Sequence, residues 1–567
     1  MFKSAGIFLI ILILGACAGS TGMKKHQSVK SGLIADSGMV VSAHPESSQI
    51  GIDILKKGGN AVDAAVATAF ALAVCYPEAG NLGGGGFMLI RTSDGRTEVI
   101  DYREKAPLLS SRDMYLDYAG SVNEGLSTRS HLASGVPGSV DGLITAHNKY
   151  GKLPFREIIQ PAADLAENGF PLPGEQAESL NSNREEFIER NPAGTAFVCD
   201  SLWKEGDLLV QRDLAETLKR IRDYGREGFY AGSTARFILN EMKKGNGIIS
   251  EKDLADYKSV SRVPLETDYK GFKIITVPPP SGGGIILIQL LEMTEPYSIN
   301  EMDHNSPEVI HLFTEAERRS FADRSEYSGD PSFVDIPVNM LTSSKYLLER
   351  MSDFSESKAT LSGDIKPGVI SKYESEETTH FSVADKEGNA VAVTTTLNGT
   401  FGNSIVADSA GFLLNNEMDD FSIKPGFPNM YGLIGGEANA IRPGKRMLSS
   451  MTPVIVEKNG KLFLIAGSPG GSTIPTTVFQ VIVNVIDYNM DIQEAVDAGR
   501  FHHQWLPDYI AYEENSFDPA MLRKISSLGH DLKPRESIGR VNAILILPNG
   551  KKSGGADRRS FNTSCGY

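Results

Sequence analysis

The feature that most constrains the fold of this chain is the boundary at Thr378, where a polar stretch meets two strand patterns. Residues 352–377 are rich in Ser, Lys, Asp and Glu and lack a steady apolar period, which is typical of a solvated loop. Alternating runs then cover Thr379 to Asp385 and Ala390 to Leu397, joined by the turn formers Lys386–Asn389. The pattern predicts a β-hairpin whose first strand begins directly after an acidic loop.

A threonine at this boundary suits one particular chemistry. If the peptide bond before Thr378 were cut, the new amino terminus would carry a hydroxyl nucleophile and an amine base on one residue. A free α-amine has a pKa of about 7.7–8.0, against about 10.4 for lysine, so part of it is unprotonated at neutral pH. Two threonines at the start of a strand more often only begin that strand, and the rest of the sequence decides between the two interpretations.

Segments on both sides of this boundary resemble the γ-glutamyltranspeptidase family. Downstream segments follow the order and spacing of that family's small subunit: Thr394–Gly402, Asn415–Phe421, Arg446–Pro453 and Gly467–Ser472. The resemblance extends to other segments: Gly83–Gly86, Asp101–Glu104, Pro278–Gly283, Ser320–Arg324 and the terminal Gly566–Tyr567. It covers nearly the whole chain from about Ser31 onward.

The periodicity of the chain indicates sheets covered by helices, an α+β protein and not a parallel doubly wound fold. Strand patterns cover Met39 to Ser42, Phe87 to Thr92, Arg96 to Tyr102, Thr379 to Asn415 and Thr452 to Gly467. Helix patterns cover Glu46 to Lys57, Ala61 to Val74, Ser306 to about Arg324 and Thr476 to Tyr488. The resemblance implies the four-layer αββα sandwich of the N-terminal nucleophile hydrolases. Two autoprocessed fragments would form it jointly, residues 33–377 as the large subunit and 378–567 as the small catalytic subunit.

Composition excludes some classes of function. With 567 residues, 41% of them hydrophobic, the chain can bury a substantial core. Its formal charge of −15 argues against nucleic acid as a partner, because phosphate binding needs a basic surface. Beyond the N-terminal segment, the cysteines are Cys75, Cys199 and Cys565; they are far apart and form no CxxC pair. The spacing indicates neither a zinc site nor a disulfide framework, although one disulfide remains possible.

The N-terminus has the pattern of an export signal. Lys3 precedes the apolar run Gly6 to Leu14, which is too short to span a bilayer as a helix. The following Leu14–Cys17 resembles a bacterial lipobox, in which residues 1–16 are removed and Cys17 is acylated. Residues 17–32 would then be a tether to the periplasmic side of the outer membrane, since Ala18 and not Asp follows the cysteine. An ordinary signal peptide, with release into the periplasm, is the alternative.

The catalytic roles follow from the resemblance. The family pattern implies cleavage between Glu377 and Thr378, with Thr378 as nucleophile and Thr396 orienting its hydroxyl. Gly470 and Gly471 match the oxyanion position, where glycines leave backbone N–H groups unobstructed. Without the family, Thr396 is an ordinary strand residue, and the two glycines form a turn.

Recognition of a γ-glutamyl group requires binding of an amino-acid zwitterion. A guanidinium suits the α-carboxylate and hydroxyls can complete its hydrogen bonds, and Arg103, Ser449 and Ser450 match those family positions. For the α-ammonium, the matching positions are Asn398, Glu417 and Asp420. Glu417 is a departure, because many bacterial relatives have Gln there. Taken without the family, the acidic stretch around Glu417 is an ordinary solvated loop.

Two other motifs complete the set. Pro425 to Gly436 resembles the family's lid loop, whose tyrosine, here Tyr431, closes over the γ-glutamyl site; the alternative is an ordinary long loop. The pair His502–His503 is interpreted as core packing rather than as metal ligands, because no acids recur at ligand spacing.

Together these features predict an autoprocessing γ-glutamyltransferase and glutathione hydrolase that needs no metal or organic cofactor. It would cleave glutathione and related γ-glutamyl compounds through a γ-glutamyl-threonine ester, then pass the group to water or to amino-acid or dipeptide acceptors. One alternative is a glutaryl-type (cephalosporin) acylase on the same scaffold. Another is an uncleaved surface lipoprotein that binds amino acids without turnover.

Overall fold

The computed structural model describes residues 31–366 and 378–567, which belong to one unit, Ser31–Tyr567. The expected signal peptide (1–16), the lipidation site Cys17, nearly all of the tether (17–32) and Glu377 lie outside the described residues. No described helix combines the length and hydropathy needed to cross a bilayer.

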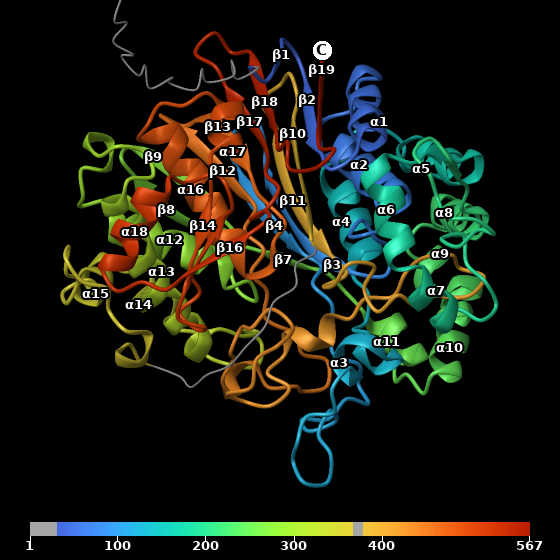
Figure 1. Cartoon of the computed structure of the whole chain (residues 1–567). Helices are drawn as coiled ribbons and strands as arrows, with labels where there is room; N and C mark the ends of the chain where they lie inside the picture. The colour runs from blue at the N-terminus through green and yellow to red at the C-terminus, as the bar shows by residue number, and fades with distance from the viewer. Residues whose placement is uncertain (1–30, 367–377) are drawn as a thin grey trace, which may run out of the picture. The chain divides into compact units, whose positions relative to one another are not determined.

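Two seven-stranded sheets form the centre of this unit (Figure 1). Sheet A has the order β1 (Leu33–Ala35), β18 (Lys552–Ala556), β17 (Asn542–Ile546), β13 (Lys461–Ala466), β12 (Val454–Lys458), β9 (Phe272–Thr276) and β8 (Leu265–Tyr269). Sheet B has the order β19 (Thr563–Gly566), β2 (Met39–Ser42), β10 (Thr379–Ala384), β11 (Ala390–Thr396), β3 (Gly85–Arg91), β4 (Thr97–Asp101) and β7 (Val260–Arg262). Strands from before and after Thr378 are interleaved in both sheets.

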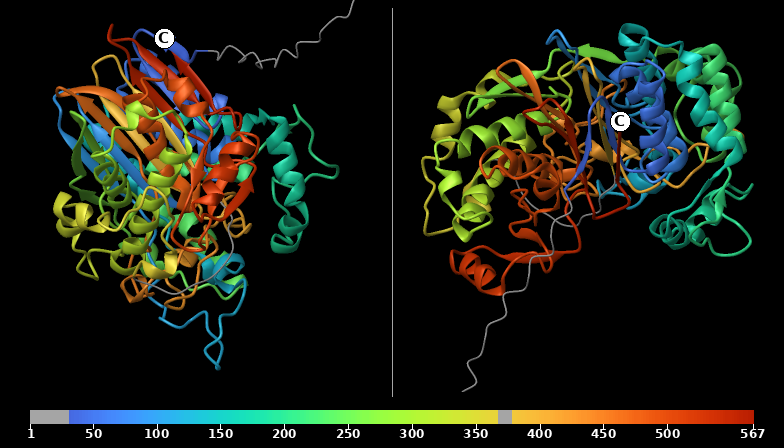
Figure 2. Two further views of the ribbon diagram at one scale, coloured as in Figure 1. Left: turned by 60° about the vertical axis from the view of Figure 1, so that its left-hand side comes forward. Right: turned by 90° about the horizontal axis from the view of Figure 1, so that it is seen from above.

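Helices cover the outer faces of the two sheets (Figures 1 and 2). Sheet B is covered by α1 (Pro45–Lys56), α2 (Ala61–Cys75) and α4 (Ser139–Tyr150). Outside these, α5 (Phe155–Asn168) packs against α2, and α8 (Arg212–Tyr224) packs against α5. Sheet A is covered by α12 (Gly283–Thr294), α13 (Pro307–Tyr327) and α16 (Ile474–Ile486). The layers therefore run helix, sheet, sheet, helix, as the family resemblance implied.

Smaller elements surround these layers. The other helices are α3 (Leu126–Arg129), α6 (Gly174–Ser182), α7 (Arg184–Arg190), α9 (Glu227–Tyr230), α10 (Gly232–Lys244), α11 (Glu251–Asp256), α14 (Val338–Leu341), α15 (Ser344–Arg350), α17 (Ile492–Asp497) and α18 (Pro519–Ser527). The minor strands are β5 (Phe170–Pro171), β6 (Leu208–Leu209), β14 (Phe501–His502), β15 (Ile510–Glu513) and β16 (Leu532–Arg535).

The period-two pattern of the central hairpin explains why it is buried on both faces. On β10, Phe381 and Val383 pack into the helix-covered cluster that includes α2, whereas Ala384 faces the cluster between the sheets. On β11, Val391 and Ala392 divide in the same way. Alternate side chains of a strand point to opposite faces, so one sequence serves two cores.

Most sequence-based boundaries agree with the structure within one or two residues. Helix α2 starts after the predicted cap Asn60, whose side chain accepts from the Asp63 N–H. The prediction that strands continue from Leu397 to Asn415 is wrong, because this segment contains turns and isolated bridges. Its φ values are positive at Asn398, Phe401, Ser404 and Ser409, and such left-handed residues interrupt an extended strand. The three described cysteines are all free.

Candidate active site

One small cavity collects nearly all the residues that the sequence singled out. Its volume is about 20 Å³, room for roughly one water molecule. The residues in its wall are Arg103, Thr378, Thr396, Asn398, Glu417, Asp420, Tyr431, Leu433, Ser449, Ser450, Met451, Gly471 and Ile474. Of the predicted described site residues, only Gly470 is not in this wall.

The β10–β11 register places Thr378 beside Thr396. Thr379 pairs with Thr395 in this antiparallel hairpin, so the residue before β10 lies opposite the last residue of β11. Both threonines are buried, with exposed fractions of 4% and 3%. The Thr396 hydroxyl accepts from the Asn398 N–H at 2.8 Å, which fixes that side chain at the end of its strand.

The glycine pair lies at the start of a helix. Gly470 precedes the short 3-10 turn Gly471–Thr473, which leads directly into α16. Both glycines have positive φ, +133° and +50°, and neither N–H donates to another described residue. A Cβ on Gly471 would lie 2.7 Å from the Tyr431 ring, so only glycine fits there. Free N–H donors at the positive end of a helix can stabilise a developing negative charge.

Arg103 lies two residues beyond β4 and is the centre of a buried charge network. Its Nη1 donates to Glu417, its Nη2 donates to Asp420, and Glu104 lies 3.4 Å from Nη1. Nη2 also donates to the Leu448 carbonyl at 3.0 Å. The groups predicted to bind opposite ends of a zwitterion are therefore paired with one another in this structure.

Burial changes the acidity of these carboxyl groups. It raises the pKa of Glu104 to about 7, although Arg103 acts in the opposite direction. The pKa values of Glu417 and Asp420 are also raised, first by burial, while Arg103 lowers both. Perturbed carboxyl groups of this kind in a cavity are typical of functional sites.

The loop that carries Tyr431 is seated in the cavity wall. The Tyr431 hydroxyl donates to the Asn398 carbonyl, and the ring is only 4% exposed. Gln504 Nε2 donates to the Tyr431 carbonyl at 3.1 Å. Next to it, the Met430 N–H donates to Asp419 at 2.7 Å. The loop thus covers Gly471 from one side.

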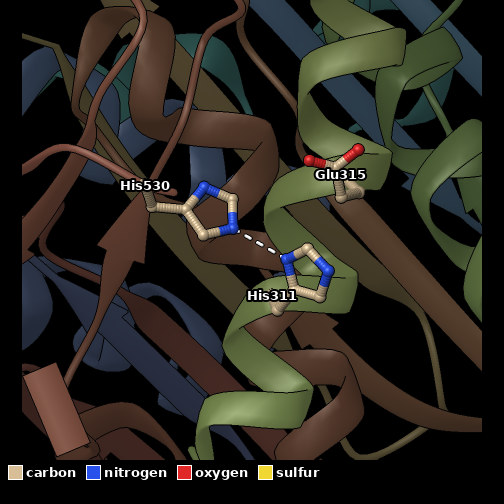
Figure 3. A group of neighbouring side chains, drawn as sticks. All are labelled: His311, Glu315 and His530. Carbon is tan, nitrogen blue, oxygen red and sulfur yellow. Dashed lines mark hydrogen bonds between the residues drawn. The ribbon is translucent and has the colours of Figure 1, made fainter. Parts of the chain in front are cut away.

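A second cluster, His311, Glu315 and His530, has the composition of a metal site (Figure 3). His311 Nε2 is 2.7 Å from the Ser355 carbonyl and must donate to it, so His311 Nδ1 accepts from His530 Nε2 at 2.7 Å. The Arg318 guanidinium is 3.5 Å from both His530 Nδ1 and Glu315. These groups satisfy one another beside a fixed positive charge, and the donor set does not suit a cation.

The pair His502 and His503 is packed in the core. The two ring nitrogens of His502 lie 2.9 Å from the Thr476 hydroxyl and 3.0 Å from Gln504. Burial lowers the pKa of His502 to about 3 and that of His503 to about 4. Both are neutral hydrogen-bonding groups at physiological pH.

Comparisons with known proteins agree with this geometry. Residues 47–567 match the family model described as gamma-glutamyltranspeptidase. The chain belongs to the γ-glutamyltranspeptidase family. It is 45% identical over 576 residues to the glutathione hydrolase proenzyme of Escherichia coli, covering 99% of this chain and 98% of the relative.

Solved structures extend the family likeness to the fold. Helicobacter pylori gamma-glutamyltranspeptidase has a TM-score of 0.57 and 42% identity, over 61% of this chain and 97% of that chain. The cephalosporin acylase from Bacillus halodurans has a TM-score of 0.84 and 25% identity, over 97% and 99% of the two chains. The predictions of the family and of the αββα fold are confirmed.

Two residues of this region were not singled out from the sequence. Glu104 contributes a third carboxylate beside Arg103, and its only signal was its place directly after that arginine. Asp419 accepts from Ser127 Oγ at 2.6 Å and from the Met430 N–H at 2.7 Å, which joins α3 to the Tyr431 loop. Its signal was the acidic run Glu417–Asp420.

Proposed function

We propose that Thr378 is both the nucleophile and the base of this autoprocessing γ-glutamyltransferase and glutathione hydrolase. The observation that supports this role is that Thr378 and the groups suited to a zwitterion, Arg103, Glu417 and Asp420, line the same cavity. A nucleophile next to such groups would meet the far end of a γ-glutamyl side chain.

Maturation would begin with attack of the Thr378 hydroxyl on the Glu377 carbonyl carbon. The acyl group passes from the Thr378 nitrogen to its oxygen, and the resulting ester is hydrolysed. The products are a large fragment ending at Glu377 and a small fragment whose first residue has a free α-amine. The proposed cleavage follows Glu377, which lies outside the described residues.

Turnover would use the same hydroxyl a second time. The Thr378 α-amine accepts the hydroxyl proton while the oxygen attacks the γ-carbonyl of the donor. The Gly470 and Gly471 N–H groups donate to the oxyanion, and the leaving amine takes the proton from the α-ammonium. Water or an acceptor amine then attacks the γ-glutamyl ester and restores Thr378.

The zwitterion would replace the internal ion pairs described above. Its α-carboxylate takes a place beside Arg103, Ser449 and Ser450, and its α-ammonium takes a place beside Glu417 and Asp420. Because one positive and one negative group enter together, the net charge of the cavity is unchanged, and each buried charge keeps a partner.

The test is a matched set of three variants at adjacent positions. Thr378→Ala is expected to remain one band on a denaturing gel and to release no p-nitroaniline from its γ-glutamyl derivative. Thr378→Ser keeps a hydroxyl and is expected to mature with reduced activity. Thr379→Val removes a hydroxyl that has no hydrogen-bond partner in the described part of the chain, and it is expected to mature normally, with Thr378 as the new N-terminus. A mature, active Thr378→Ala protein would refute the assignment.

A glutaryl acylase is the second candidate, favoured by the likeness to the Bacillus halodurans cephalosporin acylase. A glutaryl group keeps the carboxylate but has no ammonium, so Glu417 and Asp420 would have no partner. Faster hydrolysis of glutaryl-p-nitroanilide than of γ-glutamyl-p-nitroanilide would favour this alternative. An uncleaved, inactive wild-type chain would instead favour a binding lipoprotein.

The proposal also includes the acceptors of the γ-glutamyl group and the location of the protein in the cell. Amino acids or dipeptides act as acceptors, so glycylglycine is expected to accelerate p-nitroaniline release. The protein is exported and attached to the periplasmic side of the outer membrane through acylated Cys17. In cells fed labelled palmitate, the wild type is expected to carry label in the membrane fraction, whereas Cys17→Ala is expected to be unlabelled.

A further inference from the structure

Arg324, near the end of α13, is a buried cation whose hydrogen-bond partner belongs to the cavity wall. It is 7% exposed, and its Nη2 donates to Ser450 Oγ at 3.2 Å. Its Nε has no hydrogen-bond partner within residues 31–366 and 378–567. Among the residues that the structure describes, no carboxylate lies within ion-pairing distance of it. A buried guanidinium without a carboxylate partner is costly unless an anion is present in the working state.

Other buried arginines on the same helix do not share this property. Arg318 is paired with Asp508, and Arg319 with Glu315 at 2.7 Å. Arg324 differs because the nearby carboxylate, Asp420, is bonded to Arg103 instead. Burial lowers the pKa of Arg324 to about 10, so the guanidinium remains charged at neutral pH.

Two sequence motifs without an assigned role meet at this point. From the segment Pro278–Gly283, the Pro280 carbonyl accepts from the Ser449 N–H at 3.0 Å, and the Gly282 N–H donates to the Ser449 carbonyl at 2.8 Å. A Cβ on Gly282 would lie 3.4 Å from Arg324 Cγ, so the arginine stem lies against this segment. The segment Pro278–Gly283 therefore fixes the backbone of Ser449. The segment Ser320–Arg324 supplies the cation that contacts Ser450.

This arrangement determines where the Ser450 hydroxyl can donate. A hydroxyl that accepts from a guanidinium directs its own proton elsewhere, and Ser450 borders the cavity. We propose that Arg324 is a positioning residue that holds Ser450 as a donor to the α-carboxylate of the γ-glutamyl donor. The inference rests on the proposed function and adds a second buried positive charge to α-carboxylate recognition.

The surrounding charges favour the α-carboxylate of the donor, and not its α-ammonium, as the group beside Ser450 and Arg324. Arg103 is paired with Glu104, Glu417 and Asp420, so it is already surrounded by negative charge. A ligand ammonium would be repelled by Arg324, whereas a ligand carboxylate beside Ser450 would be attracted to it. Arg324 thus favours donors that carry an α-carboxylate.

The experiment compares two donors that differ in this group alone. γ-Glutamyl-p-nitroanilide has the α-carboxylate, and 4-aminobutyryl-p-nitroanilide lacks it but keeps the ammonium. Arg324→Met is expected to lower kcat/KM for the first by about 10- to 100-fold, mainly through KM, and to leave the second nearly unchanged. Arg220→Met is the matched control, because Arg220 also donates to hydroxyls, those of Thr234 and Thr217, away from the cavity.

A double-mutant cycle with Ser450→Ala separates positioning from a general structural effect. If Arg324 acts through Ser450, the double variant is expected to be little worse than either single variant. Equal losses for both donors, or fully additive losses in the cycle, would overturn the proposal. If Arg324→Met does not mature, Arg324→Lys with Ser450→Ala gives the same cycle with the charge retained.

Failure of the proposed function would appear differently, as a wild-type enzyme without activity on the γ-glutamyl donor.

Discussion

The Arg103 guanidinium donates directly to the Glu417 carboxylate, although the two residues are 314 positions apart in the sequence and suit opposite ends of the substrate. Glu104 and Asp420 also pair with this guanidinium, so acidic groups outnumber Arg103 in the cluster. In the proposed function, a bound zwitterion would exchange partners with this pair, and the energy of binding would depend on how readily the pair opens.

This pair predicts how donor binding responds to pH. The pKa of Glu104 is about 7, and those of Glu417 and Asp420 are raised. As the pH falls through about 7, the cluster takes up protons and its attraction for the ammonium weakens, so KM for the donor is expected to rise on the acidic side. Steady-state kinetics between pH 5.5 and 8.5 at constant ionic strength would measure this.

Glu417→Gln is expected to move that rise in KM to lower pH, because it removes a carboxyl group whose own pKa is raised well above its ordinary value. The same substitution should also change how the stability of the folded protein depends on pH. A carboxyl group whose pKa in the folded protein exceeds its ordinary value of 4.5 makes the folded protein less stable as the pH rises between the two values. The gain in Tm of Glu417→Gln over wild type should therefore be larger at pH 8 than at pH 5. An unchanged KM–pH profile would contradict the account.

Gly471→Ala is expected to lower kcat by about 100- to 1,000-fold, since a Cβ would displace Tyr431 and disturb the oxyanion donors. The matched control is Gly460→Ala. Gly460 also has positive φ, +73°, but nothing lies within 4 Å of an added Cβ. Both variants pay the backbone strain, so only the first should lose catalysis. Equal activity of the two variants would remove Gly471 from the oxyanion site.

Thr396→Val is expected to reduce kcat by about 10- to 100-fold with little change in KM, because the nucleophile would lose its orienting hydroxyl. Burst kinetics with the γ-glutamyl donor would locate the loss in ester formation. Thr276→Val on β9 removes another buried strand hydroxyl, bonded to the Pro453 carbonyl, and should keep full activity. A rise in KM alone would assign Thr396 to binding.

Tyr431→Phe tests whether the Tyr431 hydroxyl holds its loop, the proposed lid, in place. Loss of its hydrogen bond to the Asn398 carbonyl is expected to raise donor KM roughly fivefold. The control Tyr230→Phe removes a comparable bond, to the Pro137 carbonyl at 2.9 Å, outside the cavity. Wild-type KM in Tyr431→Phe would mean that the ring alone, and not its hydroxyl, holds the loop.

Local patterns explain what could be predicted from the sequence. The turn Lys386–Asn389 sets the hairpin register, so the closeness of Thr378 and Thr396 follows from two adjacent strands. The Arg103–Glu417 pair could not be predicted in this way, because it depends on tertiary packing of distant segments. The absence of strands between Leu397 and Asn415 was also missed, since left-handed residues such as Phe401 have no strong sequence signal.

The interleaving of strands has a consequence for the mature enzyme. In sheet B, β10 lies between β2 and β11, and β11 lies between β10 and β3, so each fragment contributes ladders that the other completes. The two pieces cannot dissociate without melting both sheets, and hydrolysis of one bond leaves the native ladders intact. After denaturation of the two-chain enzyme, however, the two separate polypeptides must collide before the shared sheets can form again. Recovery of activity by the cut form should therefore depend on protein concentration. Refolding of the uncut, inactive Thr378→Ala precursor, measured as recovery of folded structure, should not.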